Sequence, residues 1–69
     1  MDEIIFLIEE DPEGGYTARA MGHSVFTDGE SVPVIKQNIK DAVACHFDED
    51  EKPKMIRLHF VRQEIMSNV

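Results

Sequence analysis

The sequence lacks the features that stabilise a chain covalently, anchor it in a membrane or divide it into domains. Cys45 is the single cysteine, so no disulfide can form within one chain, and a lone thiol is typical of the cytoplasm. The apolar run Ile4–Ile8 is bordered by acids and is too short for a signal peptide or a membrane span. No repeat, low-complexity tract or linker interrupts the 69 residues. We therefore expect one cytoplasmic domain over residues 1–69, small enough for a partner or a second copy to help stabilise it.

Basic residues are scarce in the first half of the chain. Residues 1–30 hold eight acids and one base, Arg19, whereas residues 31–69 hold six of each. Nucleic-acid binding needs Lys and Arg to face phosphates, so the sequence argues against a direct nucleic-acid partner. The acidity favours a basic protein partner by electrostatic steering, or it only keeps a small domain in solution.

Strand and turn signals alternate through the first 30 residues. Ile4–Ile8 predicts a strand that is apolar on both sides and therefore central in its sheet. Residues 10–15 contain the proline and glycines of a hairpin loop, and Tyr16–Met21 alternates as the return strand. Val25–Thr27 is long enough for a short third strand.

A helix and a final strand follow. Ser31 is a good N-cap, Pro33 suits the first turn, and apolar residues at helical spacing predict a helix over 32–47. The acidic run 48–51 opposes the helix dipole and predicts a loop, after which Met55–Val61 alternates as a strand.

The order β-β-β-α-β predicts an α+β fold. Three strands form an antiparallel meander, and a right-handed crossover places the fourth strand parallel to the first, with one helix packed on one face. The other face stays open and half apolar, so we expect it to contact a second chain in a homo-oligomer. Its predicted residues are Ile5, Leu7, Thr17, Arg19, Arg57, His59 and Val61.

No catalytic group stands out. A two-metal nuclease site needs carboxylates converging from strand interiors, and Ile4–Ile8 has none, so we expect no enzyme, metal or cofactor. Cys45 and His46 point about 100° apart on a helix and cannot easily share an ion. We expect His46 at the edge of the core and Cys45 partly buried.

The hairpin loop is the candidate site for a partner. Its acids contact either a basic protein or only water, and Tyr16 either anchors an interface or closes the core. The candidate partner-binding residues are Glu9, Glu10, Asp11, Glu13 and Tyr16.

Four motifs resemble the HicB-type antitoxin family: Gly14-Gly15-Tyr16, Gly22-His23, Gly29-Glu30-Ser31 and the Asn38–Val43 segment NIKDAV. The resemblance spans roughly residues 4–62. It implies a truncated ribonuclease-H-like fold without nuclease activity, which binds a small basic RNA-cleaving toxin and masks its active site.

Many members of that family also carry a C-terminal DNA-binding module. About eight residues follow the last predicted strand here, so we expect no such module and no direct repression. An alternative is a stand-alone homo-oligomeric module of the same fold with no toxin partner.

Overall fold

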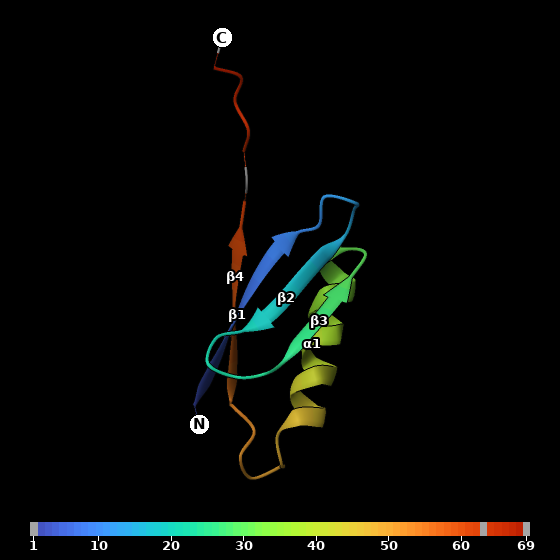
Figure 1. Ribbon diagram of the computed structural model, residues 1–69. Coiled ribbons are helices and arrows are strands. Elements are labelled where there is room, and N and C mark those ends of the chain that lie inside the picture. The colour runs from blue at the N-terminus through green and yellow to red at the C-terminus, as the bar shows by residue number, and fades with distance from the viewer. Residues whose placement is uncertain (1, 63, 69) are drawn as a thin grey trace.

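The computed structural model describes residues 2–62 and 64–68. Its elements are β1 (Glu3–Glu10), β2 (Tyr16–Ala20), β3 (Phe26–Gly29), α1 (Val32–His46) and β4 (Met55–Val61). The strands lie in the order β3-β2-β1-β4, with β1 antiparallel to β2 and parallel to β4 (Figure 1). The predicted α+β fold is therefore confirmed. The third strand lies slightly later than predicted, and the helix ends one residue earlier.

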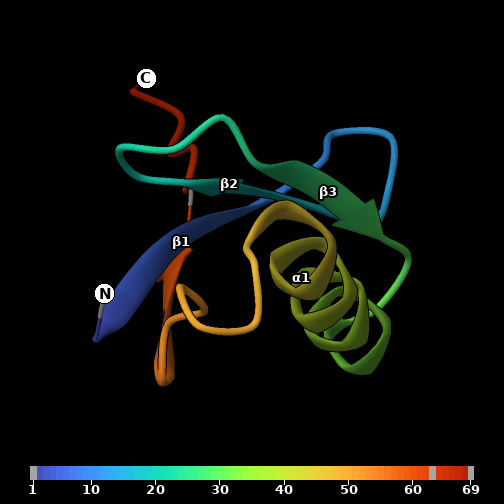
Figure 2. The same ribbon diagram turned by 90° about the horizontal axis from the view of Figure 1, so that it is seen from below.

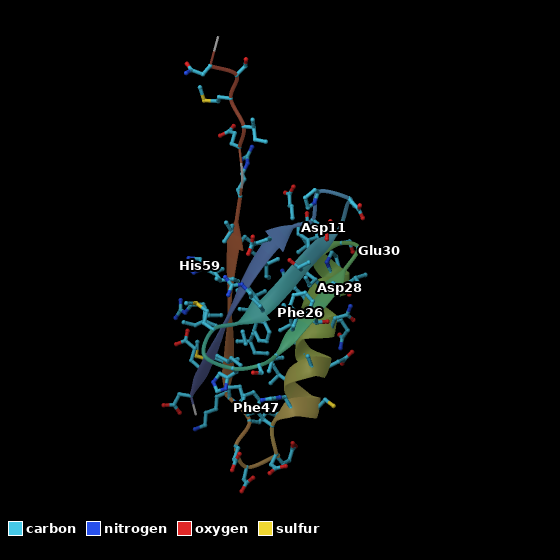
Figure 3. All side chains as sticks on the ribbon, in the orientation of Figure 1. Asp11, Phe26, Asp28, Glu30, Phe47 and His59 are labelled. Atoms are coloured by element: carbon cyan, nitrogen blue, oxygen red, sulfur yellow. The ribbon has the colours of Figure 1, made fainter. Side chains whose placement is uncertain are left out.

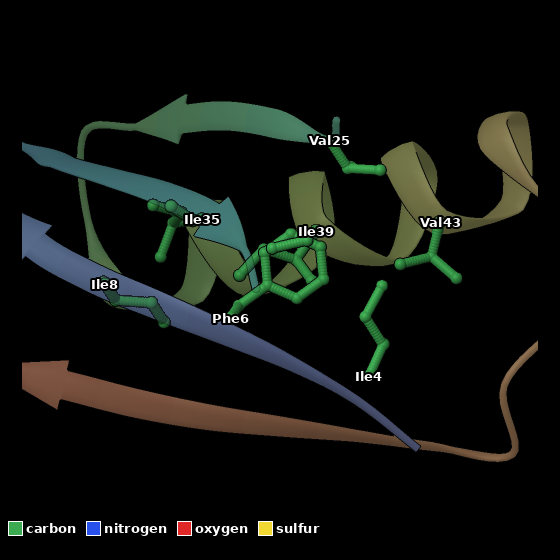
Figure 4. Packing of buried hydrophobic residues seen from close by; sticks show 9 residues of the cluster. Ile4, Phe6, Ile8, Val25, Ile35, Ile39 and Val43 are labelled. Atoms are coloured by element: carbon green, nitrogen blue, oxygen red, sulfur yellow. The ribbon is translucent and has the colours of Figure 1, made fainter. Parts of the chain in front are cut away.

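The core lies between β1 and α1 because β1 alternates. Ile4, Phe6 and Ile8 point toward the helix and are at most 2% exposed (Figure 4). Burying side chains of this size contributes about 1.5–3 kcal/mol each. The rest of the core comes from β2, the β2–β3 connection and the helix: Ala18, Ala20, Val25, Ile35, Ile39 and Val43.

The helix begins at the predicted residue and ends one residue before the predicted end. Ser31 has extended backbone, and its hydroxyl accepts a hydrogen bond from the Val34 N–H at 3.4 Å, which satisfies a free helix amide. At the other end, the Phe47 N–H donates to the Val43 carbonyl oxygen at 3.1 Å, and the backbone of Phe47 is extended.

The helix does not lie over the middle of the sheet. It packs against β2 and β3 and the inward side of β1, and β4 lies to one side of it (Figure 2). On β4, Ile56 and Leu58 are half-buried and Phe60 is 48% exposed, although all three side chains lie on the helix side. The offset leaves a groove of about 130 Å³, here called the α1–β4 groove, lined by Lys36, Ile39, Lys40, Ile56 and Leu58.

The opposite face of the sheet carries the residues predicted to lie away from the helix. The strand register places there Ile5, Leu7, Thr17, Arg19, Arg57, His59 and Val61, and Phe26 joins them. This open face is more polar than expected because two ion pairs cross it. The Arg19 Nε lies 4.0 Å from the Glu9 carboxylate, and Arg57 pairs with Glu3. Whether this face forms an oligomer contact stays a prediction.

The chain after β4, described at Arg62 and residues 64–68 and here called the tail, continues in line with the strand (Figure 1). It contributes to a molecule that measures 55 × 20 × 18 Å. Ile65 is 95% exposed and Met66 is 85% exposed. Two large apolar side chains of the tail are therefore exposed to solvent.

Candidate protein-docking surfaces

The hairpin between β1 and β2 is a tight loop that holds its acids in place. The Asp11 carboxylate accepts the Glu13 N–H, the Asp11 N–H donates to the Gly15 carbonyl oxygen, and the Gly14 N–H donates to that of Asp11, each at 2.9 Å. Gly14 and Gly15 have φ of +106° and +80°, which favours glycine at both positions. The backbone of the hairpin thus requires the pair Gly14-Gly15, which belongs to the motif that predicted it.

Two glycines bring this loop close to the turn between β3 and α1. A Cβ on Gly15 would lie 2.9 Å from the Gly29 carbonyl oxygen, and one on Gly29 would lie 2.7 Å from the Ile35 nitrogen. Larger residues would push the loop, the strand end and the helix apart. Because both loops carry acids, their close approach brings acidic residues of the two loops together.

Three acidic residues from the two loops line one hollow of about 270 Å³, here called the acidic hollow. Asp11 comes from the hairpin, and Asp28 and Glu30 come from the end of β3 and the turn that follows (Figure 3). The other lining residues are Gly14, Tyr16 and Gly29, so no base lines it among the described residues. The Asn38 amide fixes the turn by donating to the Asp28 carbonyl oxygen at 2.7 Å.

Tyr16 packs against the core, which is one of the two roles that the sequence left open, and its role at an interface stays a prediction. Its half-buried side chain packs against the core, and it also lines the acidic hollow. Aromatic residues that are rigidly held and partly accessible are typical of protein interfaces. Tyr16 therefore offers an apolar floor beside the carboxylates.

A second hollow of about 350 Å³ lies on the other side of the hairpin. It is lined by Glu9, Glu10, Asp11, Pro12, Val61 and Ile65. Of the predicted partner-binding residues, Glu9 and Glu10 thus meet Asp11 here, and Tyr16 meets Asp11 in the acidic hollow. Glu13 is exposed on the loop and lines neither.

The sequence analysis missed Asp28 and Glu30 as members of the site. Neither residue is among those predicted for the partner site, and Glu30 appears in the sequence analysis only within the motif Gly29-Glu30-Ser31. The signal that could have found them is the pair Gly15 and Gly29, since adjacent strand ends that each carry a glycine can bring their loops together.

The polar residues near the end of α1 do not form a site. Within residues 2–62 and 64–68, no three His, Cys, Asp or Glu side chains could hold a metal ion. The rings of His23 and His46 both meet Phe47 edge-on, at centroid distances of 5.4 and 4.8 Å. The expected burial of His46 and Cys45 is wrong, as both are exposed. Val43 is the last buried helix residue, and Phe47 covers this end of the core instead.

Across the described part of the chain, no helix has the length and apolar character needed to cross a membrane.

Comparison with known proteins gives two similar sequences. A UPF0150 protein of Archaeoglobus fulgidus is 54% identical over 55 residues, which cover 80% of this chain and 82% of the relative. The chain belongs to the UPF0150 family. A UPF0150 protein of Thermotoga maritima is 42% identical over 60 residues, covering 87% of this chain and 84% of that relative. No family model and no solved structure matches the chain.

Proposed function

We propose that this UPF0150 chain acts in the cytoplasm as a protein-docking module of the HicB-antitoxin type, which binds a small basic RNA-cleaving toxin and masks its active site. The observation that carries the proposal is the acidic hollow. Asp11, Asp28 and Glu30 from two loops line it together with Tyr16, which also packs against the core.

The chemistry of this hollow suits a basic side chain. Arg and Lys form short, charge-assisted hydrogen bonds with carboxylates, and an Arg guanidinium can also stack on an aromatic ring. In addition, most of the acids in residues 1–30 lie in or beside the hairpin and the β3–α1 turn, where their field would attract a basic protein before contact.

The direct test is co-expression with the product of the small open reading frame next to the gene. We expect that product to cleave RNA and arrest growth, and we expect this chain to relieve the arrest and to copurify with it. A neighbour that is not toxic, or toxicity that this chain leaves unrelieved, would contradict the proposal.

A pair of charge reversals then locates the docking surface. Asp28 and Glu30 are exposed, so Asp28→Lys with Glu30→Lys should leave the fold intact. We expect this variant to bind the toxin at least about tenfold more weakly in calorimetry, a change of about 1.4 kcal/mol.

The matched control makes the same change in charge at the opposite end, in the exposed turn after α1. Asp50→Lys with Glu51→Lys should keep most of the affinity, because those residues lie far from the hairpin (Figure 1). Equal losses in both variants would mean that only net charge matters, and the acidic hollow would not be the contact.

A second candidate is the homo-oligomeric module without a toxin, built through the open face. The observation that favours it is Phe26, which lies on that face and is 66% exposed. This alternative expects an oligomer of the pure chain by light scattering, which Leu7→Glu and Phe26→Glu both reduce to monomers. An unchanged mass in both variants would remove it.

A further inference from the structure

The outer edge of β4 is free and suited to pairing with another strand. The Met55 N–H donates to the Asp2 carbonyl oxygen at 3.0 Å, so it points toward β1. Alternate residues of a strand direct their backbone groups to opposite edges, so the amides of Ile56, Leu58 and Phe60 point away from β1. β4 is the last strand of the sheet, and residues 54–62 contain no proline that would block a neighbour.

The side chains of the same three residues lie on the helix side, along the α1–β4 groove. Ile39, Ile56 and Leu58 make its apolar lining, and Lys36 and Lys40 of α1 flank it. Neither lysine forms an ion pair with any residue of the described chain. In a protein of net charge −7, this groove is a local basic site with an apolar floor. It fits a strand that carries an acid next to apolar residues, and it does not fit a basic toxin.

The tail of this chain has that chemistry. Glu64 is followed by the exposed Ile65 and Met66, and the tail projects beyond the end of β4 without lining its own groove (Figure 1). Because the described tail residues belong to no helix or strand of their own chain, they can add to a neighbouring sheet edge as a strand.

We propose that two copies of this chain pair antiparallel through the free edges of β4, so that the tail of each copy lies along the α1–β4 groove of the other. The two sheets then form one continuous sheet of eight strands around a two-fold axis. The free edge of β4 and the exposed apolar residues of the tail are covered in the same step.

The exposed fractions of the apolar side chains favour one register between the two β4 strands. With Phe60 opposite Phe60 of the second copy, Glu64 lies opposite Ile56 and Arg62 lies opposite Leu58 on the helix side, and Ile65 lies opposite Met55 on the open face. Phe60, Met55 and Ile65 are 48%, 60% and 95% exposed in the single chain.

The two neighbouring registers are poorer. A shift of two residues in one direction sets Ile65 opposite the charged Arg57. The opposite shift sets it opposite Pro53, which lies before the start of β4 and is already buried in the single chain.

This dimer does not rest on the proposed toxin binding. It uses the β4 edge and leaves the acidic hollow open at Asp28 and Glu30. It also differs from assembly through the open face, since Leu7→Glu should leave it intact.

Reversing the charges of Lys36, Lys40 and Glu64 and measuring the mass by sedimentation tests the pairing. We expect the pure chain to sediment with twice its 7.9 kDa mass at micromolar concentration. Lys36→Glu with Lys40→Glu should raise the dimer dissociation constant on the order of tenfold, as should Glu64→Lys alone, because each dimer contains two such contacts. Combining the three changes should restore the affinity toward that of the unmodified chain. A monomeric chain at these concentrations, or a combined variant weaker than either parent, would overturn the proposal.

Cysteine cross-linking tests the register in a Cys45→Ser background. Met55→Cys with Ile65→Cys places two thiols at facing positions about 4.5 Å apart between Cα atoms, which suits a disulfide. We expect mild oxidation to give a covalent dimer on a non-reducing gel, whereas each single cysteine gives a monomer. A folded double variant that stays monomeric, or single variants that cross-link equally well, would contradict the register.

Discussion

The two neighbours of β1 show how unevenly this small domain is covered. On one side, β2 and β3 lie under α1, and Ala18 and Ala20 of β2 are buried. On the other side, β4 pairs along the whole of its length with β1, yet Phe60 is 48% exposed on the same face of the sheet. The covered half accounts for the core, and the β4 margin contributes backbone hydrogen bonds but little burial.

Because of this difference, side chains of the covered half determine the stability of the domain, and side chains of the β4 margin and the tail determine its association with other molecules. A side chain between α1 and the sheet is surrounded by protein, so its loss leaves a cavity. A side chain at the β4 margin or in the tail meets solvent in the single chain, so it gains contacts only when another molecule arrives.

Two phenylalanines on the same face of adjacent strands give the largest expected effect. Phe6 is fully buried, so Phe6→Ala should lower the free energy of unfolding by about 3–5 kcal/mol. Phe60→Ala should lower the free energy of unfolding of the monomer by about 1 kcal/mol, because half of its surface is already in water. Urea titrations at a protein concentration low enough to keep the chain monomeric compare the two. Equal losses would show that the β4 margin is packed as tightly as the core.

The helix cap is the next test of the covered half. Ser31→Ala removes the hydroxyl that accepts the Val34 N–H, and it should cost about 1 kcal/mol of unfolding free energy. Ser31→Asp serves as the control, since its carboxylate can cap the same amide and should keep most of the stability. Thermal unfolding by circular dichroism measures both, and an unaffected alanine variant would mean that the cap is not used.

An ion pair at the margin should have the smallest effect. Arg57 pairs with Glu3 across β1 and β4, but the Arg57 side chain is 60% exposed and the Glu3 side chain is 34% exposed. Arg57→Ala should therefore change the unfolding free energy by less than about 1 kcal/mol, and less again in high salt. A loss of several kcal/mol in the same urea titration would place the pair among the main stabilising contacts.

The sequence predicts the order of elements and the face on which each residue lies. The alternation of Ile4, Phe6 and Ile8 gives the buried side of β1, and Ser31 with Pro33 gives the start of the helix. These signals are local, because strand period and capping depend on a few consecutive residues.

The position of the helix across the sheet depends on contacts between residues that are far apart in the sequence. Periodicity shows that Ile35, Ile39 and Val43 face the sheet, but it does not show which strands they cover. Gly29 decides this in part, since its lack of a Cβ lets Ile35 approach β3 closely. The exposure of Phe60, the α1–β4 groove and the meeting of Asp11 with Asp28 all follow from three-dimensional packing. For that reason the sequence did not reveal them.

Amide hydrogen exchange along β4, followed residue by residue by NMR, tests directly whether the outer edge of β4 pairs with a second copy. The amides of Arg57 and His59 face β1, so they should be protected at every protein concentration. The amides of Ile56, Leu58 and Phe60 face outward, so they should exchange fast in dilute solution and become protected as the concentration rises and the edges pair. Outward amides that exchange fast at all concentrations, in a chain whose inward amides stay protected, would contradict β4 as the dimer edge.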